Sequence, residues 1–175
     1  KQMPGIINKR FVEYKEFAGK TVTEIFKSEE LADAEIKEIN TFESVYVENL
    51  GDHKFKLKPL PAYAQVSKIM SILVQDVNSD GNLDAIIGGN YDGASMYHAR
   101  YDAFFGLTLL GDGKGNFKTS IPTQNGLLID GDCRDIKSVK TETENLILAS
   151  RNNNSIQIFK PLKKARKRHL NSCQE

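Results

Sequence analysis

The chain has 175 residues, of which 39% are hydrophobic and 27% charged, as is ordinary for one globular domain with a core of its own. Its 24 Lys and Arg residues nearly balance 23 Asp and Glu residues, which excludes a uniformly basic nucleic-acid-binding domain and a highly charged disordered chain. Two cysteines are too few for a disulfide framework, and no apolar run is long enough to span a membrane. Because the chain starts at Lys1 without an apolar leader, we expect it to be a piece of a longer protein.

The N-terminal segment is predicted to be helical. Between residues 6 and 40, apolar side chains recur at spacings of three and four residues, which is typical of one apolar helix face. Gly19 interrupts this pattern, and Thr21 with Glu24 fits a capping box that starts a new helix. We therefore predict two or three short helices in this segment rather than a coiled coil.

From residue 41 onward, short apolar runs alternate with turns rich in Gly, Asp and Asn. These candidate strands cover residues 44–50, 55–58, 69–74, 85–89, 104–110, 127–129, 145–150 and 155–159. Many short strands at regular spacing indicate a β-sandwich, a barrel or a propeller.

An internal repeat narrows this choice. Residues 49–55 resemble residues 109–117, since each reads as a strand, a Gly/Asp hairpin and an aromatic residue that starts the return strand. Gly51 and Gly111 set an offset of 60 residues, and residues 85–90 align with residues 147–152 at nearly the same offset. The order of the two matches favours two copies of a four-stranded unit, although common hairpin sequences can also match by coincidence.

The strongest chemical signal is the run Asp-Val-Asn-Ser-Asp-Gly-Asn-Leu-Asp at residues 76–84. Oxygen-bearing side chains alternate along it, and its Gly permits a sharp turn. Ca²⁺ prefers about six to eight oxygen ligands, and the absence of His and Cys disfavours zinc or copper. We predict a Ca²⁺ site made by Asp76, Asn78, Asp80, Asn82 and Asp84, with Asn82 contributing its backbone carbonyl and Asp84 closing the site. The alternative is a turn rich in Asp and Asn that holds no ion.

This loop differs from an EF-hand. Ile87 stands where an EF-hand loop requires its last Glu ligand, and apolar strands rather than helices are predicted on both sides. The pattern Asp-x-Asn-x-Asp-Gly-x-x-Asp, followed by apolar residues and Gly-Gly-Asn, instead resembles the FG-GAP or VCBS repeat. Such repeats are the blades of integrin-α-like β-propellers, which carry calcium in a hairpin between strands.

The resemblance extends over residues 10–160 to the C-terminal part of bacterial VCBS-repeat proteins, which are related to the ASPIC/UnbV group. It implies a mainly β fold with two propeller-type blades after a short helical segment, and an incomplete propeller whose remaining blades lie upstream in the parent protein. We accordingly expect a helical segment at 1–40, a first blade with the calcium loop at 41–103, a second blade at 104–160, and a disordered basic tail at 161–175.

The second copy departs from the calcium pattern. Residues 130–135 read Asp-Gly-Asp-Cys-Arg-Asp, which places the cation of Arg134 where a ligand should stand. We predict no second ion of this kind and expect Arg134 to pair with a carboxylate. Cys133 is expected to be a half-buried apolar residue rather than a nucleophile.

A loop at residues 91–102 combines aromatic, cationic and acidic groups. Its candidate ligand-binding residues, for a glycan or a peptide, are Tyr97, His98, Arg100, Tyr101 and Asp102. The alternative is a structural loop in which Arg100 and Asp102 anchor the chain to the sheet.

Residues 160–175 hold six basic residues against one acidic residue, which suits either a solvated terminus or an anion-binding segment.

Enzyme chemistry has little support, because the three His residues are scattered and no nucleophile, phosphate-loop or zinc motif is present. The sequence therefore predicts a calcium-binding, non-catalytic interaction or scaffold module of an exported or cell-surface protein. Its compartment would be extracellular, periplasmic or associated with the outer membrane. Its partner would be a protein or glycan at the cell surface, and no nucleic-acid partner is expected. The alternative function is a carbohydrate-active enzyme, or part of one, that uses clustered Asp residues.

Overall fold

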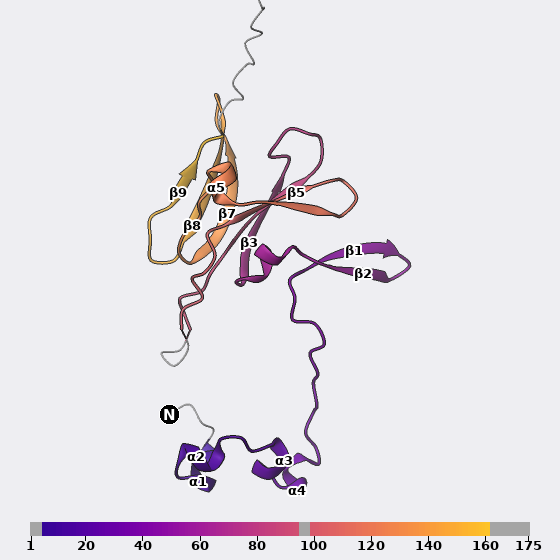
Figure 1. The fold of residues 1–175 in the computed structure, drawn as a ribbon, viewed down its shortest axis with the longest axis vertical. Coiled ribbons are helices and arrows are strands. Elements are labelled where there is room, and N and C mark those ends of the chain that lie inside the picture. The colour runs from indigo at the N-terminus through magenta and orange to yellow at the C-terminus, as the bar shows by residue number, and fades with distance from the viewer. Residues whose placement is uncertain (1–4, 95–98, 162–175) are drawn as a thin grey trace, which may run out of the picture. The chain divides into compact units, whose positions relative to one another are not determined.

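The computed structural model describes residues 5–94 and 99–161. The chain divides into two compact units, residues 1–42 and residues 43–175 (Figure 1). The candidate ligand residues Tyr97 and His98 lie outside the described residues, as does the predicted basic tail after residue 161.

The described part of the first unit holds four short helices, where the sequence predicted two or three: α1 Gly5–Arg10, α2 Tyr14–Phe17, α3 Val22–Ile25 and α4 Ser28–Leu31. The predicted capping box at α3 is confirmed, since the backbone N–H of Thr21 donates to Glu24 Oε2 at 2.7 Å. Arg10 joins the helices by donating to the backbone carbonyl of Ile25 at 2.7 Å and by pairing with Glu30.

The second unit consists mainly of β-strands, as predicted. The strands are β1 Val45–Gly51, β2 Lys54–Pro59, β3 Ile69–Gln75, β4 Asp84–Gly89, β5 Leu107–Gly111, β6 Phe117–Ser120, β7 Cys133–Lys140, β8 Asn145–Arg151 and β9 Gln157–Phe159. A 3-10 turn, η1 Ala62–Gln65, follows β2, and a short helix, α5 Pro122–Asn125, follows β6. The predicted strand at residues 127–129 is wrong, because that segment is irregular.

The strands form three antiparallel sheets in chain order, none of them closed within the described residues. The hairpin sheet is β1-β2, the central sheet is β3-β4-β5-β6, and the C-terminal sheet is β7-β8-β9 (Figure 1). The predicted boundary between residues 103 and 104 falls inside the central sheet, because β4 and β5 pair directly at Ala85↔Leu109 and Ile87↔Leu107.

Two apolar clusters cover opposite faces of the central sheet. On one face, Ile86 packs with Cys133, Ile136, Ile147 and Ala149 of the C-terminal sheet. On the other face, Ile87, Leu107 and Leu109 pack with Ala64 of η1 and with Phe104. Neighbouring residues of a strand point to opposite faces of the sheet. Ile86 and Ile87, both in β4, therefore each anchor one of the two apolar clusters.

The central and C-terminal sheets start with the same irregularity. The pairing register shifts between Ile69 and Ser71 in β3, and between Cys133 and Asp135 in β7. The two bulges meet, because the Ser71 hydroxyl donates to Asp135 Oδ1 at 3.2 Å and accepts from the backbone N–H of Ile136 at 2.9 Å. A β-bulge bends its strand locally, so both sheets begin with a similar bend.

Candidate metal site

The predicted calcium loop joins β3 to β4 and winds around the carboxylate of Asp76. Asp76 Oδ1 accepts the backbone N–H groups of Ser79 at 2.7 Å and Asp80 at 3.2 Å, and Oδ2 accepts that of Gly81 at 3.0 Å. The chain turns this tightly because Ser79 and Gly81 adopt positive φ angles of 62° and 90°. The first predicted ligand therefore lies inside the turn.

The next two predicted ligands also turn toward the loop. Asn78 Oδ1 accepts the backbone N–H of Asp80 at 2.9 Å, while Asn78 Nδ2 donates to Asp80 Oδ2 at 2.8 Å. Asp80 Oδ1 accepts the backbone N–H of Asn82 at 2.8 Å. Asx hydrogen bonds of this kind fix the side chains at alternating positions of a turn.

Asp84 has a role that sequence reasoning missed. Its carboxylate is 1% exposed, and both oxygens accept backbone N–H groups: Oδ2 that of Val77 at 2.9 Å and Oδ1 that of Gly111 at 2.9 Å. A Cβ at Gly111 would lie 2.2 Å from the Leu83 carbonyl oxygen, so only glycine lets β5 approach the loop this closely. Asp84 therefore closes the loop and ties it to β5.

The donor set fits a hard cation. Asp76, Asn78 and Asp80 offer only oxygen ligands when the amide oxygen of Asn78 is counted. Asp76 Oδ2 accepts one backbone N–H and keeps a second lone pair, whereas Asp76 Oδ1 already accepts two. The described residues contain no cluster of three or more His, Cys, Asp or Glu side chains arranged to hold a metal. The structure therefore does not gather the carboxylates of Asp76, Asp80 and Asp84 into one metal-binding cluster. The preference for Ca²⁺ over a transition metal rests on the oxygen chemistry of Asp76, Asn78 and Asp80.

A second turn lies across from the loop. The turn between β5 and β6 is held by Asp112, whose Oδ1 accepts the backbone N–H groups of Lys114 at 2.8 Å and Asn116 at 3.0 Å. The side-chain amide of Asn116 donates to Asp112 Oδ2 at 2.6 Å, and these hydrogen bonds lower the pKa of Asp112 to about 2. A pocket of about 550 Å³ is lined from both turns, by Asn78, Asp80 and Asn82 on one side and Asp112 and Asn116 on the other.

The candidate ligand loop is closed at its base by two tyrosines. Tyr91 and Tyr101 exchange backbone hydrogen bonds of 2.9 and 3.2 Å. Lys68 Nζ lies 4.8 Å from the ring centroid of Tyr91 and 5.0 Å from that of Tyr101, within the range of a cation–π contact. Tyr101 is exposed, as are its chain neighbours Arg100 and Asp102.

The expected pairing of Arg134 is confirmed, because its Nη2 lies 2.7 Å from Asp132 Oδ2. The Arg134 guanidinium also lies 5.4 Å from the centroid of the Tyr91 ring. Residues 130–135, however, run into the start of β7 and do not form the hairpin equivalent to the calcium loop. In the C-terminal sheet, the connection that corresponds to the β3–β4 loop is the turn between β7 and β8, at residues 141–144. In this turn the Thr141 backbone N–H donates to the Glu144 carbonyl at 2.8 Å.

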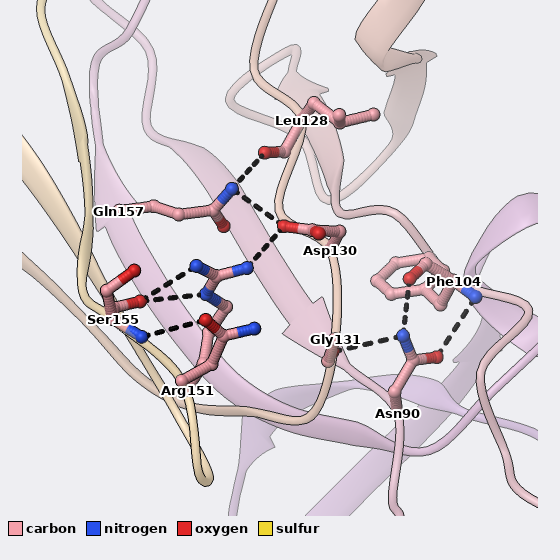
Figure 2. Close-up of polar contacts among 9 residues, drawn as sticks. Asn90, Phe104, Leu128, Asp130, Gly131, Arg151, Ser155 and Gln157 are labelled. Carbon is pink, nitrogen blue, oxygen red and sulfur yellow. Dashed lines mark hydrogen bonds and ion pairs between the residues drawn. The ribbon is translucent and has the colours of Figure 1, made fainter.

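Polar contacts fix the chain that enters the C-terminal sheet (Figure 2). Asn90, which is buried, donates to the carbonyls of Phe104 at 2.6 Å and Gly131 at 3.1 Å, and accepts from the Phe104 backbone N–H at 3.0 Å. Arg151 Nη1 pairs with Asp130 Oδ1 at 2.6 Å, as Figure 2 shows. These hydrogen bonds and this ion pair use polar side chains to hold the chain in place.

The chain matches no protein-family model, no curated protein and no solved structure. Within the described ranges, no helix combines the length and apolarity needed to cross a membrane.

Proposed function

We propose that the chain is a calcium-binding, non-catalytic interaction or scaffold module made of propeller-type blades, and that it belongs to an exported or cell-surface protein. The observation that carries this proposal is the β3–β4 loop, which is wound around Asp76 with Asn78 and Asp80 turned inward. Ca²⁺ bound there would add ligand bonds to a loop that Asp84 already ties to β5.

Several features support the blade assignment. The central sheet is a four-stranded antiparallel meander, which is the form of a propeller blade. Its first two strands match β7 and β8 of the C-terminal sheet, because both pairs carry a bulge at the same place. The hairpin sheet matches β5-β6, since Gly51 and Gly111 stand at the same point of two similar hairpins.

A compartment rich in calcium suits this site. Extracellular calcium modules bind the ion with dissociation constants of about 10⁻⁴ to 10⁻³ M, which millimolar calcium fills. Binding to the folded state raises stability by mass action, by about 2.7 kcal/mol at 100 times the dissociation constant. The proposed role of the ion is therefore to stiffen the loop that joins the edge strand β3 to β4 in the central sheet.

The proposed partner surface is the loop closed by Tyr91 and Tyr101. The Tyr101 side chain is 45% exposed, and Arg100 and Asp102 flank it with opposite charges. An aromatic ring beside hydrogen-bonding charged groups suits a protein or glycan ligand.

Thermal unfolding of the metal-stripped chain, with and without Ca²⁺, tests the calcium proposal. We expect Ca²⁺ to raise the Tm and excess chelator to reverse the change, with Mg²⁺ less effective. The double variant Asp76→Asn and Asp80→Asn keeps the side-chain shapes, removes two charges, and should abolish most of the shift. Asp52→Asn, in the turn of the hairpin sheet, is the matched control and should keep it. A Tm that does not respond to Ca²⁺ in the unmodified chain refutes the proposal.

A further inference from the structure

One face of β3 is apolar and uncovered. Ile72 and Val74 are each 56% exposed, and they lie on the face opposite to the C-terminal sheet, because they pair with Ile87 and Ala85 of β4. The same face carries the buried side chains of Ile87, Leu107 and Leu109 further along the sheet. It is therefore a core-like surface at β5 and an open one at β3.

The equivalent position in the C-terminal sheet is covered. Ile136 follows the bulge of β7 by the same number of residues as Ile72 follows the bulge of β3. Ile136 is only 1% exposed, because the central sheet packs on it through Ile86 and Leu73. Two isoleucines at the same place in similar strands thus differ in whether a sheet covers them.

The hairpin sheet covers only part of the open face. Its Tyr46 ring meets the Phe117 ring of β6 edge-on, with centroids 5.4 Å apart. Between the hairpin sheet and strands β3, β4 and β5, a pocket of about 540 Å³ remains, lined by Val45, Ile72, Val74 and other mostly apolar residues. The hairpin sheet therefore covers the apolar face of the central sheet at β5-β6 and leaves it open at β3-β4.

The hairpin sheet also has an open edge beside this pocket. Within the described residues, β1 pairs with β2 alone. The Leu60 backbone N–H donates to the Ser44 carbonyl, and since hydrogen-bonded residues alternate in an antiparallel pair, the backbone groups of Val45 and Val47 point to the other edge. In the matching strand β5, that edge pairs with β4.

We propose that this surface docks an antiparallel pair of short β-strands of the β3-β4 type, which the residues described here do not supply. One strand of the pair hydrogen-bonds to the open edge of β1, and its apolar side chains cover Ile72 and Val74. The facing residues of the occupant are large aliphatic side chains, because Leu73 and Ile86 fill that role against Ile136. This inference rests on the blade assignment of the proposed function and is independent of calcium.

A tethered strand pair tests the proposal. A second copy of residues 66–92, flanked by Gly/Ser linkers, is inserted between Phe42 and Glu43 of the full chain, where tethering gives the insert a high effective concentration. We expect amide hydrogen exchange of Val45 and Val47 to slow by about tenfold or more, since new ladder bonds protect those amides. An insert with its apolar strand residues replaced by Ser should leave their exchange unchanged.

Two further variants of the tethered chain separate docking from a general effect. Ile72→Asp should restore fast exchange at Val45 and Val47, while Ile158→Asp, which changes a similarly exposed isoleucine of the C-terminal sheet, should not. The amides of Ile86 and Ile87 report that the central sheet stays folded. If the tethered chain does not fold, the same peptide added in trans to the unmodified chain must give the same protection.

The outcomes distinguish this inference from the calcium proposal. If exchange at Val45 and Val47 slows in a chain that binds no calcium, the slowed exchange supports docking. The missing calcium binding then refutes the calcium site alone. Unchanged exchange at Val45 and Val47 in a folded, calcium-binding chain overturns the inference. Protection that appears without the insert and rises with protein concentration also overturns it, because the occupant would then be a second copy of the chain.

Discussion

The buried carboxylate of Asp84 accepts the backbone N–H of Gly111 at 2.9 Å, and so joins the end of the β3–β4 loop to a strand 27 residues later. Its other oxygen accepts the N–H of Val77, at the start of the same loop. One side chain thus closes the loop and fixes it to its neighbour in the sheet. The geometry of the candidate metal site depends on this carboxylate whether or not an ion is bound.

Asp84→Asn should therefore destabilise the metal-free chain. An amide keeps one acceptor oxygen but turns an NH₂ group toward a backbone donor, which leaves a buried N–H without a partner at a cost of about 1–3 kcal/mol. Urea unfolding in excess chelator measures this loss. Asp80→Asn is the control, because its bonds stay within an exposed loop, and it should cost less than half as much. Equal losses in the two variants would contradict the role given to Asp84.

The pH dependence of the β5–β6 turn follows from Asp112. Hydrogen bonds from Asn116 and Lys114 lower its pKa to about 2 in the folded chain, below the usual value near 3.8. A lowered pKa gives stability that is present above about pH 4 and is lost as the pH falls from about 4 to 2. We expect the side-chain carboxyl of Asp112 to titrate near pH 2 by NMR.

Asp112→Asn should reduce the loss of stability between pH 4 and pH 2 relative to the unmodified chain. Asp52→Asn, in the matching turn of the hairpin sheet, serves as the control and should not. A carboxyl of Asp112 that titrates near pH 4 would show that the turn does not hold the ionised form.

Glycine at position 88 is required by the packing of the two sheets. A Cβ there would lie 2.5 Å from Cys133 Sγ and 3.0 Å from Ile136 Cδ1. Gly88→Ala should therefore destabilise the chain by about 1–3 kcal/mol, as overpacking of a filled core does. In a Cys133→Ala background the cost of Gly88→Ala should shrink, because Cys133 Sγ, the atom nearest to the new Cβ, is gone. Denaturant unfolding of the unmodified chain, the two single variants and the double variant forms a double-mutant cycle, which gives the coupling energy between the two positions.

The sequence predicts the strands whose pattern is strong and misses those whose burial comes from a neighbour. The apolar run of β4 and the Gly/Asp hairpin of β5-β6 are readable because the signal is local. β7 is not readable from sequence, because only its Cys133 and Ile136 are buried, and the rest of the strand is mostly polar. Its place is set by packing on Ile86 across the sheets, which no short window of sequence contains.

The candidate site shows the same division. The spacing of Asp76, Asn78 and Asp80 predicts a loop wound inward, because Asx turns depend on near neighbours. The bond from Gly111 to Asp84 joins residues far apart in the chain, and the sequence gives Asp84 only the role of a ligand. The sequence shows the turn held by Asp112 as part of the internal repeat. It does not show that this turn lies next to the β3–β4 loop, with which it lines one pocket.

The thiol of Cys133 should resist modification until the chain unfolds. Its side chain is fully buried, and burial, reinforced by the charges of Asp135 and Asp132, raises its pKa to about 11. Since the thiolate is the reactive form, a chain with Cys173→Ser should react with a disulfide reagent at pH 8 about 100-fold more slowly when folded than in urea. The raised pKa also predicts that stability falls as the pH rises from about 9 toward 11, because the unfolded thiol loses its proton first. Similar reaction rates in the folded and unfolded chain would place Cys133 at an exposed surface and contradict the packing of the two sheets.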